Sequence, residues 1–157
     1  MRMKNPVIPN NTVYAERESV CMGDDCTAPN AALLHFEDGT MLSAFLKTVA
    51  GYVPHMSLKQ HTIWVVENDG RPIAFLDGEM GTDSYIEVLA IEDIPVKELA
   101  DRRIYCRYFY DFQGYLNTEL SSFINDEWKK AHPECRTLLD YVKAYYDLPV
   151  SERWGWS

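Results

Sequence analysis

Two apolar, β-rich segments separated by a short turn constrain the fold of this chain most strongly. The segments cover residues 61–67 (HTIWVVE) and 72–77 (PIAFLD), and both are rich in residues that favour strands. Asn68, Asp69 and Gly70 lie between them, and these residue types tolerate the positive φ angles of a tight hairpin. The sequence therefore predicts an antiparallel hairpin near the middle of the chain.

A second clear pattern is a helical stripe that follows Thr40. We expect Thr40 to cap this helix at its N-terminus and Pro54 to end it. The same type of spacing predicts two helices near the C-terminus, over residues 116–132 and 138–145. The apolar residues that recur at helical spacing after Thr40 are Met41, Leu42, Phe45, Leu46, Val49 and Val53.

Further strands flank these elements. Residues 14–20, 30–36, 85–91 and 104–110 are β-prone, and a short helix is expected from residue 95 to residue 102. The order is strand, strand, helix, hairpin, strand, short helix, strand, helix, helix. This order predicts an α+β fold, with a mainly antiparallel sheet of about five to six strands and helices packed on one face.

The opening order of two strands, a helix and further strands resembles the β-grasp arrangement of ubiquitin-like domains. The resemblance covers residues 12–91 and rests on the order of elements alone, so it implies a fold and no activity. A chain of 157 residues has the length of one domain that buries its core without disulfides or metal. We therefore predict a single domain over residues 1–157, with an irregular N-terminal arm at 1–11 and a C-terminal tail at 151–157.

The N-terminal segment and the cysteines indicate a cytoplasmic protein. The first residues contain no apolar run of the length that a signal peptide requires, and no later segment approaches the length of a membrane helix. We therefore expect no membrane contact. In such a chain the four cysteines are expected to be buried, reduced thiols rather than two disulfides. They are Cys21, Cys26, Cys106 and Cys135.

The negative charge of the chain is concentrated in one stretch. Residues 67–101 contain ten carboxylates against two cations, a local net charge of −8 out of −9 for the whole chain. Such a stretch repels nucleic acid and anionic lipid, and it attracts a basic protein surface or a metal ion. The residues that we expect to form an acidic binding surface are Glu67, Asp69, Asp77, Glu79, Asp83, Glu87, Glu92 and Asp93.

Aromatic and arginine residues are dense between residues 102 and 115. Their composition suits an interface or a base-stacking surface, and it also suits a central strand packed under helices. Because the neighbouring acidic stretch repels polyanions, core packing is favoured over direct binding of nucleic acid. Trp154 and Trp156 of the tail are expected to pack on the protein or on a partner. The members of the cluster are Arg102, Arg103, Tyr105, Arg107, Tyr108, Phe109, Tyr110, Phe112 and Tyr115.

The sequence contains no motif with a specific catalytic meaning. It has no Gly-x-Ser-x-Gly elbow, His-Glu-x-x-His helix, Walker loop or Gly-x-Gly-x-x-Gly turn, so the usual support for hydrolase and nucleotide chemistry is missing. We expect no cofactor. An alternative is a metal site, either from carboxylates near Asp77 or from the four residues with zinc-binding side chains. Those four are Cys21, Cys26, His132 and Cys135, whose spacing is imperfect for zinc.

The first functional hypothesis is a non-enzymatic, acidic protein-binding domain. In this hypothesis the acidic surface docks on a basic partner such as a nucleic-acid enzyme, as inhibitors and immunity-type proteins do. The alternative is a metal-supported small domain or a hydrolase of unknown substrate. A homo-oligomer, formed through an edge strand or through the tryptophan tail, is open at this point.

Overall fold

The structure is a computed structural model that describes residues 7–18, 30–53, 61–78 and 87–153, apart from the side chains of residues 87–89. It confirms the α+β class, with a mostly antiparallel sheet, one parallel strand pair, and helices. The chain forms two compact units, and each is described by itself. Residues 1–54, 65–75 and 88–107 form the first unit, and residues 55–64, 76–87 and 108–157 form the second. The predicted single domain over residues 1–157 stays a prediction.

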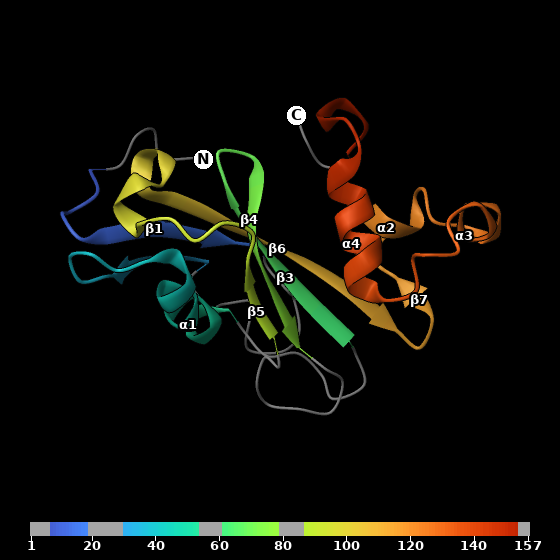
Figure 1. Ribbon diagram of the computed structural model, residues 1–157, viewed down its shortest axis with the longest axis horizontal. Helices are drawn as coiled ribbons and strands as arrows, with labels where there is room; N and C mark the ends of the chain where they lie inside the picture. Colours follow the sequence, from blue (N-terminus) through green and yellow to red (C-terminus); the bar gives the residue numbers. More distant parts are fainter. Residues whose placement is uncertain (1–6, 19–29, 54–60, 79–86, 154–157) are drawn as a thin grey trace. The chain divides into compact units, whose positions relative to one another are not determined.

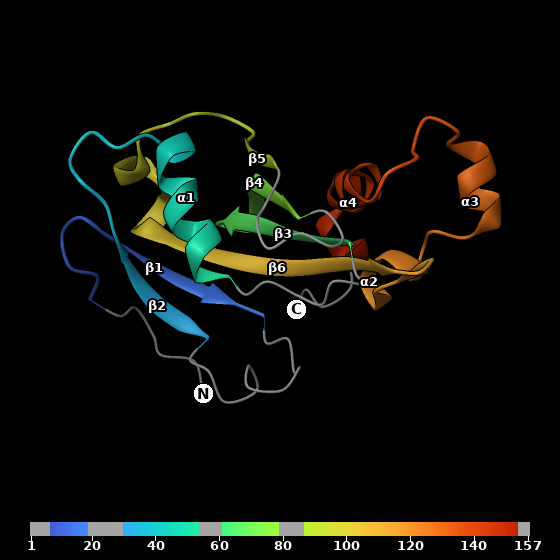
Figure 2. The same cartoon turned by 90° about the horizontal axis from the view of Figure 1, so that it is seen from below.

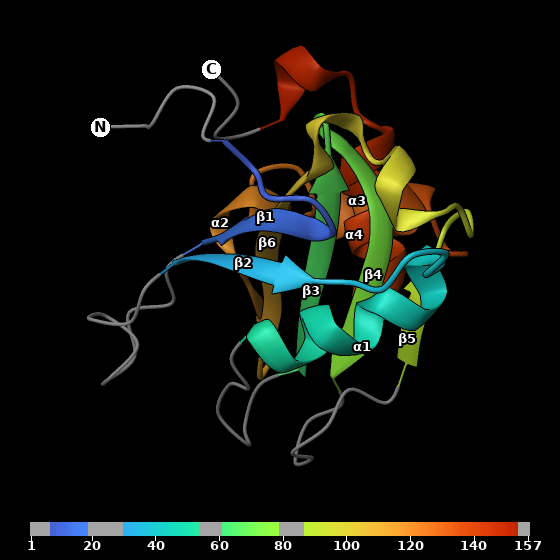
Figure 3. The ribbon, with the colours of Figure 1, turned by 90° about the vertical axis from the view of Figure 1, so that its left-hand side faces the viewer.

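The sheet has the strand order β2-β1-β6-β3-β4-β5 (Figure 3), and the first unit contains β1, β2 and the parts of the other strands that fall within its ranges. β1 (Thr12–Arg17) pairs antiparallel with β2 (Ala31–His35) and parallel with β6 (Arg103–Phe112), and Figure 2 shows the three strands side by side. The strands β3 (His61–Asn68), β4 (Arg71–Gly78) and β5 (Glu87–Ala90) complete the order. The first elements follow the order β1, β2, α1, β3, which is the order that resembles the β-grasp arrangement. The strand that pairs parallel with β1 is β6.

The hairpin that the sequence predicts is confirmed. β3 and β4 are joined by Asp69 and Gly70, which have φ angles of 54° and 76°. Two consecutive positive φ angles are typical of the tight turn that matches the twist of paired strands. Asn68 supports the turn through its side-chain amide, which donates to the carbonyls of Ala100 and Arg103 at 3.0 and 2.8 Å.

The first helix forms as predicted, but its cap differs. α1 (Leu42–Tyr52) buries Leu42, Phe45, Leu46 and Val49, which belong to the predicted stripe. The prediction that Thr40 is the N-cap was wrong, because Met41 occupies the cap position. The Thr40 hydroxyl instead donates to the carbonyl of Glu37 at 2.6 Å. A carboxylate from another part of the chain replaces the missing cap, as described below.

The segment before β6 is less regular than predicted. Instead of one short helix it contains two 3-10 turns, η2 (Val96–Glu98) and η3 (Ala100–Arg102), with Asp101 and Arg102 at positive φ. The Arg102 guanidinium then donates to the carbonyls of Ile8 and Pro9 at 3.1 and 2.7 Å. These bonds hold the N-terminal arm, whose described residues before Thr12 are irregular as expected.

The second unit contains the last part of β6, the short strand β7 (Tyr115–Leu116) and the C-terminal helices. Figure 1 shows α2 (Thr118–Ser121) beside α4 (Leu138–Asp147), with α3 (Asp126–Ala131) between them in the chain. The chain then forms the 3-10 turn η4 (Val150–Glu152). The core of this unit is aromatic, because Phe109 of β6 meets Tyr145 and Tyr146 of α4 at ring distances of 5.4 and 5.9 Å.

The continuous helix predicted over residues 116–132 was wrong. β7, α2 and α3 occupy this segment, because two asparagines redirect the backbone. The side-chain oxygen Oδ1 of Asn117 accepts a hydrogen bond from the N–H of Tyr110 at 3.0 Å, and this bond links the segment to β6. The Asn125 side chain accepts the N–H of Trp128 at 2.9 Å and so begins α3 as a new helix. The predicted last helix is confirmed as α4, which Thr137 caps.

The capping box of α4 predicts a pH dependence of stability. Hydrogen bonding by the backbone N–H of Arg136 lowers the pKa of Asp140 below its ordinary value of 3.8, and the bonds from Thr137 act in the same direction. A lowered folded-state pKa contributes stability that is present above 3.8 and lost as the pH falls through the folded value. We expect the free energy of unfolding of D140N to fall less than that of the wild type between about pH 5 and pH 2, as measured by urea denaturation. Equal losses in the two proteins would contradict this assignment.

Candidate functional site

The strand registers of the first unit place six residues on one face of the sheet. Tyr14 of β1 lies between Leu33 of β2 and Arg103 of β6. Glu16 lies in the same way between Ala31 and Tyr105. Cross-strand partners share a face, so these two rows form one continuous surface. We term this surface the open face, defined by Tyr14, Glu16, Ala31, Leu33, Arg103 and Tyr105.

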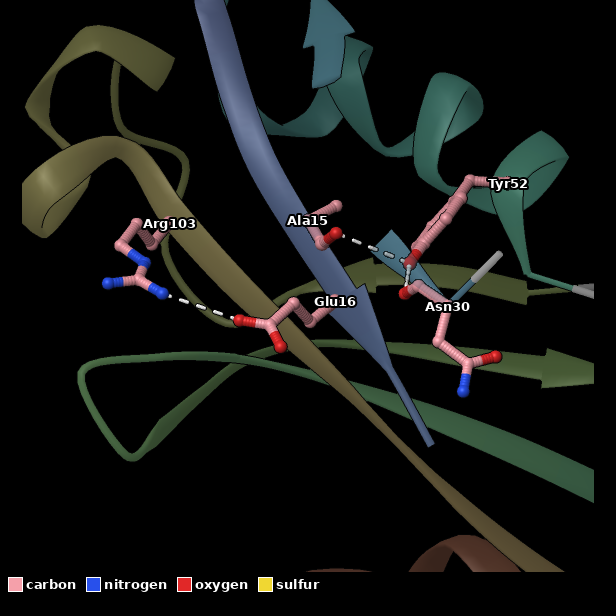
Figure 4. Close-up of polar contacts among 5 residues, drawn as sticks. All are labelled: Ala15, Glu16, Asn30, Tyr52 and Arg103. Atoms are coloured by element: carbon pink, nitrogen blue, oxygen red, sulfur yellow. Dashed lines mark hydrogen bonds and ion pairs between the residues drawn. The ribbon is translucent and has the colours of Figure 1, made fainter. Parts of the chain in front are cut away.

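The opposite face of the same strands lies under α1. Ala15 and Ile104, which alternate with the open-face residues, are buried there. Figure 4 shows Tyr52 of α1 pointing toward β1, and its hydroxyl donates to the carbonyl of Ala15 in β1 and to that of Asn30, the residue before β2. The guanidinium of Arg17 lies 6.0 Å from the ring centre of Tyr52. α1 therefore covers one face of β1 and β6, and the open face is the other.

The open face combines aromatic rings with matched charges. Arg103 Nη2 lies 3.3 Å from Glu16 Oε1 (Figure 4), and its guanidinium lies 5.2 Å from the ring centre of Tyr14. The guanidinium of Arg107 lies at the same distance from the ring of Tyr105. Tyrosine and arginine are enriched at the energetic centres of protein interfaces. Because Glu16 offsets the charge of Arg103, the face has the composition of a protein interface rather than of a polyanion-binding surface.

Burial affects the ionisable groups on both faces of these strands. It raises the pKa of the Tyr105 hydroxyl, and Glu18 acts in the same direction, so this hydroxyl stays protonated at neutral pH and can donate a hydrogen bond. Burial also raises the pKa of the Cys106 thiol, which lies fully inside the first unit. Cys106 therefore stays a thiol and is not prepared to act as a nucleophile.

The strand β2 ends the sheet with outward-facing backbone groups. The N–H of Phe36 donates to the carbonyl of Asn11 at 2.9 Å, and the N–H of Arg17 donates to the carbonyl of Asn30 at 3.0 Å. Hydrogen-bonded pairs alternate along an antiparallel ladder. The backbone N–H and C=O groups of the even-numbered residues of β2 therefore point toward β1, and those of the odd-numbered residues point away from it. Among the residues that the structure describes, no further strand pairs with β2. We term the outward residues, Ala31, Leu33 and His35, the β2 edge.

Within its own described residues, the β2 edge carries neither lysine nor acidic residues nor proline, which protect many terminal strands. Its three side chains are exposed. Leu33 is 53% exposed, which places it among the large apolar residues that lie at the surface of the described chain. The strand AALLH contains no acidic residue, lysine, proline or glycine. Natural sheet edges are normally blocked by such residues, by bulges or by covering segments. The one ionisable group, His35, lies 3.2 Å from Glu37 through its Nε2 atom.

Two residues of the expected acidic surface are buried instead. Glu67 is only 3% exposed, and its Oε2 atom lies 2.8 Å from Nε of Arg107. Asp77 is also buried, and its Oδ1 atom lies 2.6 Å from Nε2 of His61. The expectation of an exposed surface therefore fails for Glu67 and Asp77, because each carboxylate belongs to a strand and is paired with a cationic or imidazole side chain inside the protein.

Three other residues of that set are exposed: Asp69, Glu92 and Asp93. Asp69 forms the hairpin turn. Asp93 has a structural role, because Oδ1 accepts the N–H of Ser43 at 2.8 Å and Oδ2 accepts its hydroxyl at 2.9 Å. It thereby caps α1 in place of Thr40. The remaining three, Glu79, Asp83 and the side chain of Glu87, lie outside the described residues.

The residues of the alternative metal hypothesis are only partly described. The His132 ring stacks on Trp128 at 4.1 Å, and its Nδ1 atom lies 2.9 Å from the carbonyl oxygen of Trp128. Cys135 is free and half-buried, whereas a buried thiol was expected. Cys21, Cys26, Trp154 and Trp156 lie outside the described residues. Within residues 7–18, 30–53, 61–78 and 87–153, no group of three or more histidine, cysteine or acidic side chains could hold a metal ion.

Tyr14, Glu16 and Leu33 were not among the residues expected to form a site. The available signal in the sequence was the alternation of Thr12, Tyr14 and Glu16 with the apolar Val13 and Ala15, which is typical of a strand with one covered face. The order of the strands, which makes β2 terminal, had no signal in the local sequence.

No helix within the described parts of the chain has the length and apolar character needed to cross a membrane.

The burial of the Glu67–Arg107 pair predicts a large effect of Arg107→Ala. The substitution leaves a buried carboxylate without its guanidinium partner, and we expect a loss of about 3–5 kcal/mol in the free energy of unfolding. The matched control is Arg103→Ala. Arg103 and Glu16 are 27% and 28% exposed, so loss of that ion pair should cost less than about 1 kcal/mol. Urea denaturation measures both, and equal losses would contradict the assignment.

The two neighbouring exposed carboxylates are expected to behave differently. Asp93→Ala removes the cap of α1 and should lower the free energy of unfolding by about 1 kcal/mol. Glu92→Ala changes an exposed residue of similar charge next to it and should leave stability within about 0.5 kcal/mol of the wild type. Thermal denaturation of the two variants compares them directly. A Glu92→Ala loss as large as that of Asp93→Ala would contradict the capping role.

Comparison with protein-family models gives no match, and none of the curated proteins or solved structures that were searched matches the chain.

Proposed function

We propose that the chain is a non-enzymatic protein-binding domain that binds its partner through the β2 edge and the adjoining open face. The observation that carries the proposal is a terminal strand without acidic residues or lysine, with outward-facing backbone groups and an exposed Leu33. An extended protein segment can pair with such an edge through main-chain hydrogen bonds, while neighbouring side chains select the sequence.

The open face supplies the side chains for this selection. Leu33 lies beside Tyr14, and Tyr14 lies beside Arg103, so an added strand would place its own side chains next to an apolar and aromatic row. Buried tyrosine and arginine residues contribute most to the affinity of many interfaces. The guanidinium of Arg103 is held by both Glu16 and Tyr14, so part of the entropy cost of ordering it has been met before binding.

The acidic character of the chain has a different role in this proposal. A net charge of −9 accelerates the encounter with a basic partner and slows the encounter with an acidic one. Asp69, Glu92 and Asp93 are exposed and contribute to this field. An inhibitor or an immunity-type protein that docks on a basic enzyme fits this description. The charge then governs the association rate, and the β2 edge governs the lifetime of the complex.

The proposal predicts that Leu33→Lys abolishes partner binding without unfolding the protein. A lysine on a terminal strand opposes the addition of another strand, and Leu33 is exposed enough to accept it. Val150→Lys is the matched control, because Val150 is also 53% exposed and lies in η4. Immobilised wild type and both variants would be incubated with an extract of the producing cell, and the retained proteins would be identified by mass spectrometry.

We expect a protein retained by the wild type and by Val150→Lys to be lost with Leu33→Lys, and its binding by the wild type would then be measured with purified components. Circular dichroism would verify that all three proteins are folded. Retention of the same partners in the same amounts by Leu33→Lys would remove the β2 edge from the proposal.

A further inference from the structure

We propose that the protein bound at the β2 edge is a second copy of the same chain, paired through β2 in an antiparallel, two-fold symmetric arrangement. This inference rests on the proposed function, because it uses the same β2 edge, and the second copy occupies that edge when no basic partner is bound.

The backbone of β2 is self-complementary about Leu33. In an antiparallel pair with the two-fold axis at Leu33, this residue lies opposite Leu33 of the second copy, and Ala31 lies opposite His35 of the second copy. All of these residues turn their N–H and C=O groups outward, as the bonds of Phe36 and Arg17 establish. Each opposing pair would therefore exchange two hydrogen bonds, and the outward groups of the β2 edge would all be used.

The side chains also match across the axis. Leu33 of each copy would meet its equivalent, which joins the two apolar rows into one that runs from Tyr14 of one copy through both leucines to Tyr14 of the other. Directly opposed apolar side chains on one face of a sheet stabilise strand pairing. The same contact removes from water the exposed apolar side chain of Leu33.

The local charges at this edge are compatible with a second copy, although the net charge of −9 slows the encounter of two copies. β2 contains no acidic residue, so pairing of β2 with β2 brings no carboxylate directly opposite another within the strand. His35 of one copy would lie opposite the small side chain of Ala31 of the other. Glu16 is the next residue in that row, so each imidazole would lie near a carboxylate across the axis. By symmetry this arrangement occurs twice.

The size of the contact indicates a reversible dimer. A pair of five-residue strands buries less surface than the roughly 1,200–2,000 Å² of a standard stable interface. The arrangement is closed, because the same edge of both copies is used and none is left for a third copy. We therefore expect a monomer–dimer equilibrium that depends on concentration, with no larger species.

The decisive experiment is a disulfide trap at position 33. Residues that face each other in a hydrogen-bonded antiparallel pair have Cα atoms about 5.5 Å apart, which lies inside the range that a disulfide spans. Leu33→Cys would be made in the full chain with Cys21, Cys26 and Cys135 replaced by serine, and Cys106 kept because it is fully buried. Val150→Cys in the same background is the control, since Leu33 and Val150 are equally exposed.

After mild oxidation with diamide, we expect L33C to give a covalent dimer as its main product, and V150C to give only the small amount that random collisions produce. Mass spectrometry of a digest should find the peptide that contains position 33 linked to its own copy. In parallel, sedimentation velocity of the unmodified sequence should show a dimer that grows with concentration and is lost with Leu33→Lys.

Equal cross-linking of the two cysteine variants, or an unmodified sequence that stays monomeric over a hundredfold concentration range, would overturn the dimer. The proposed function would survive that result if another protein were lost from the capture experiment with Leu33→Lys. Both would fail if the chain were monomeric and no captured protein depended on Leu33. The dimer would also be overturned if L33C in extract formed a cross-link to a different protein and no cross-linked dimer. That protein would then be the partner bound at the β2 edge.

Discussion

The parallel pairing of β1 with β6 is the interaction on which the structure of the first unit depends. It joins the N-terminal hairpin to strands from much later in the chain, with Tyr14 opposite Arg103 and Arg17 opposite Cys106. Closing so long a loop costs conformational entropy, which burial of Ala15 and Ile104 under α1 offsets. The register also decides the chemistry of both faces. A shift of one residue would place Glu16 under the helix and turn apolar side chains to water.

The parts of the fold that were predictable from the sequence are those with local causes. The hairpin needs only Asp69 and Gly70 at positive φ, and α1 needs only its apolar stripe, so both have signals within a few residues. The segment after β6 was not predictable in this way. Its apolar spacing is helical, but the side-chain bonds of Asn117 and Asn125 compete with a continuous helix, and the Asn117 bond requires the distant N–H of Tyr110.

The candidate site was predictable only in part, because charge along a sequence does not determine charge on a surface. Glu67 and Asp77 count toward the acidic stretch, yet each is buried beside a residue from another part of the chain. Asp93 is exposed, but its oxygens are used by Ser43. The open face had a still weaker signal. Tyr14 and Leu33 become neighbours of Arg103 only because β6 pairs with β1, which neither local pattern nor composition records.

The two ends of the sheet differ in a way that bears on what can assemble. β5 is the other terminal strand, and its sequence begins with Glu87 and is soon followed by the exposed Glu92 and Asp93. The exposed carboxylates of Glu92 and Asp93 near that edge oppose its pairing with a second copy, whereas β2 contains no carboxylate. A sheet with one permissive edge forms a closed pair, while a sheet with two would extend into a fibre. In the proposed dimer, the exposed Glu92 and Asp93 would oppose assembly through the β5 edge and leave β2 available for pairing.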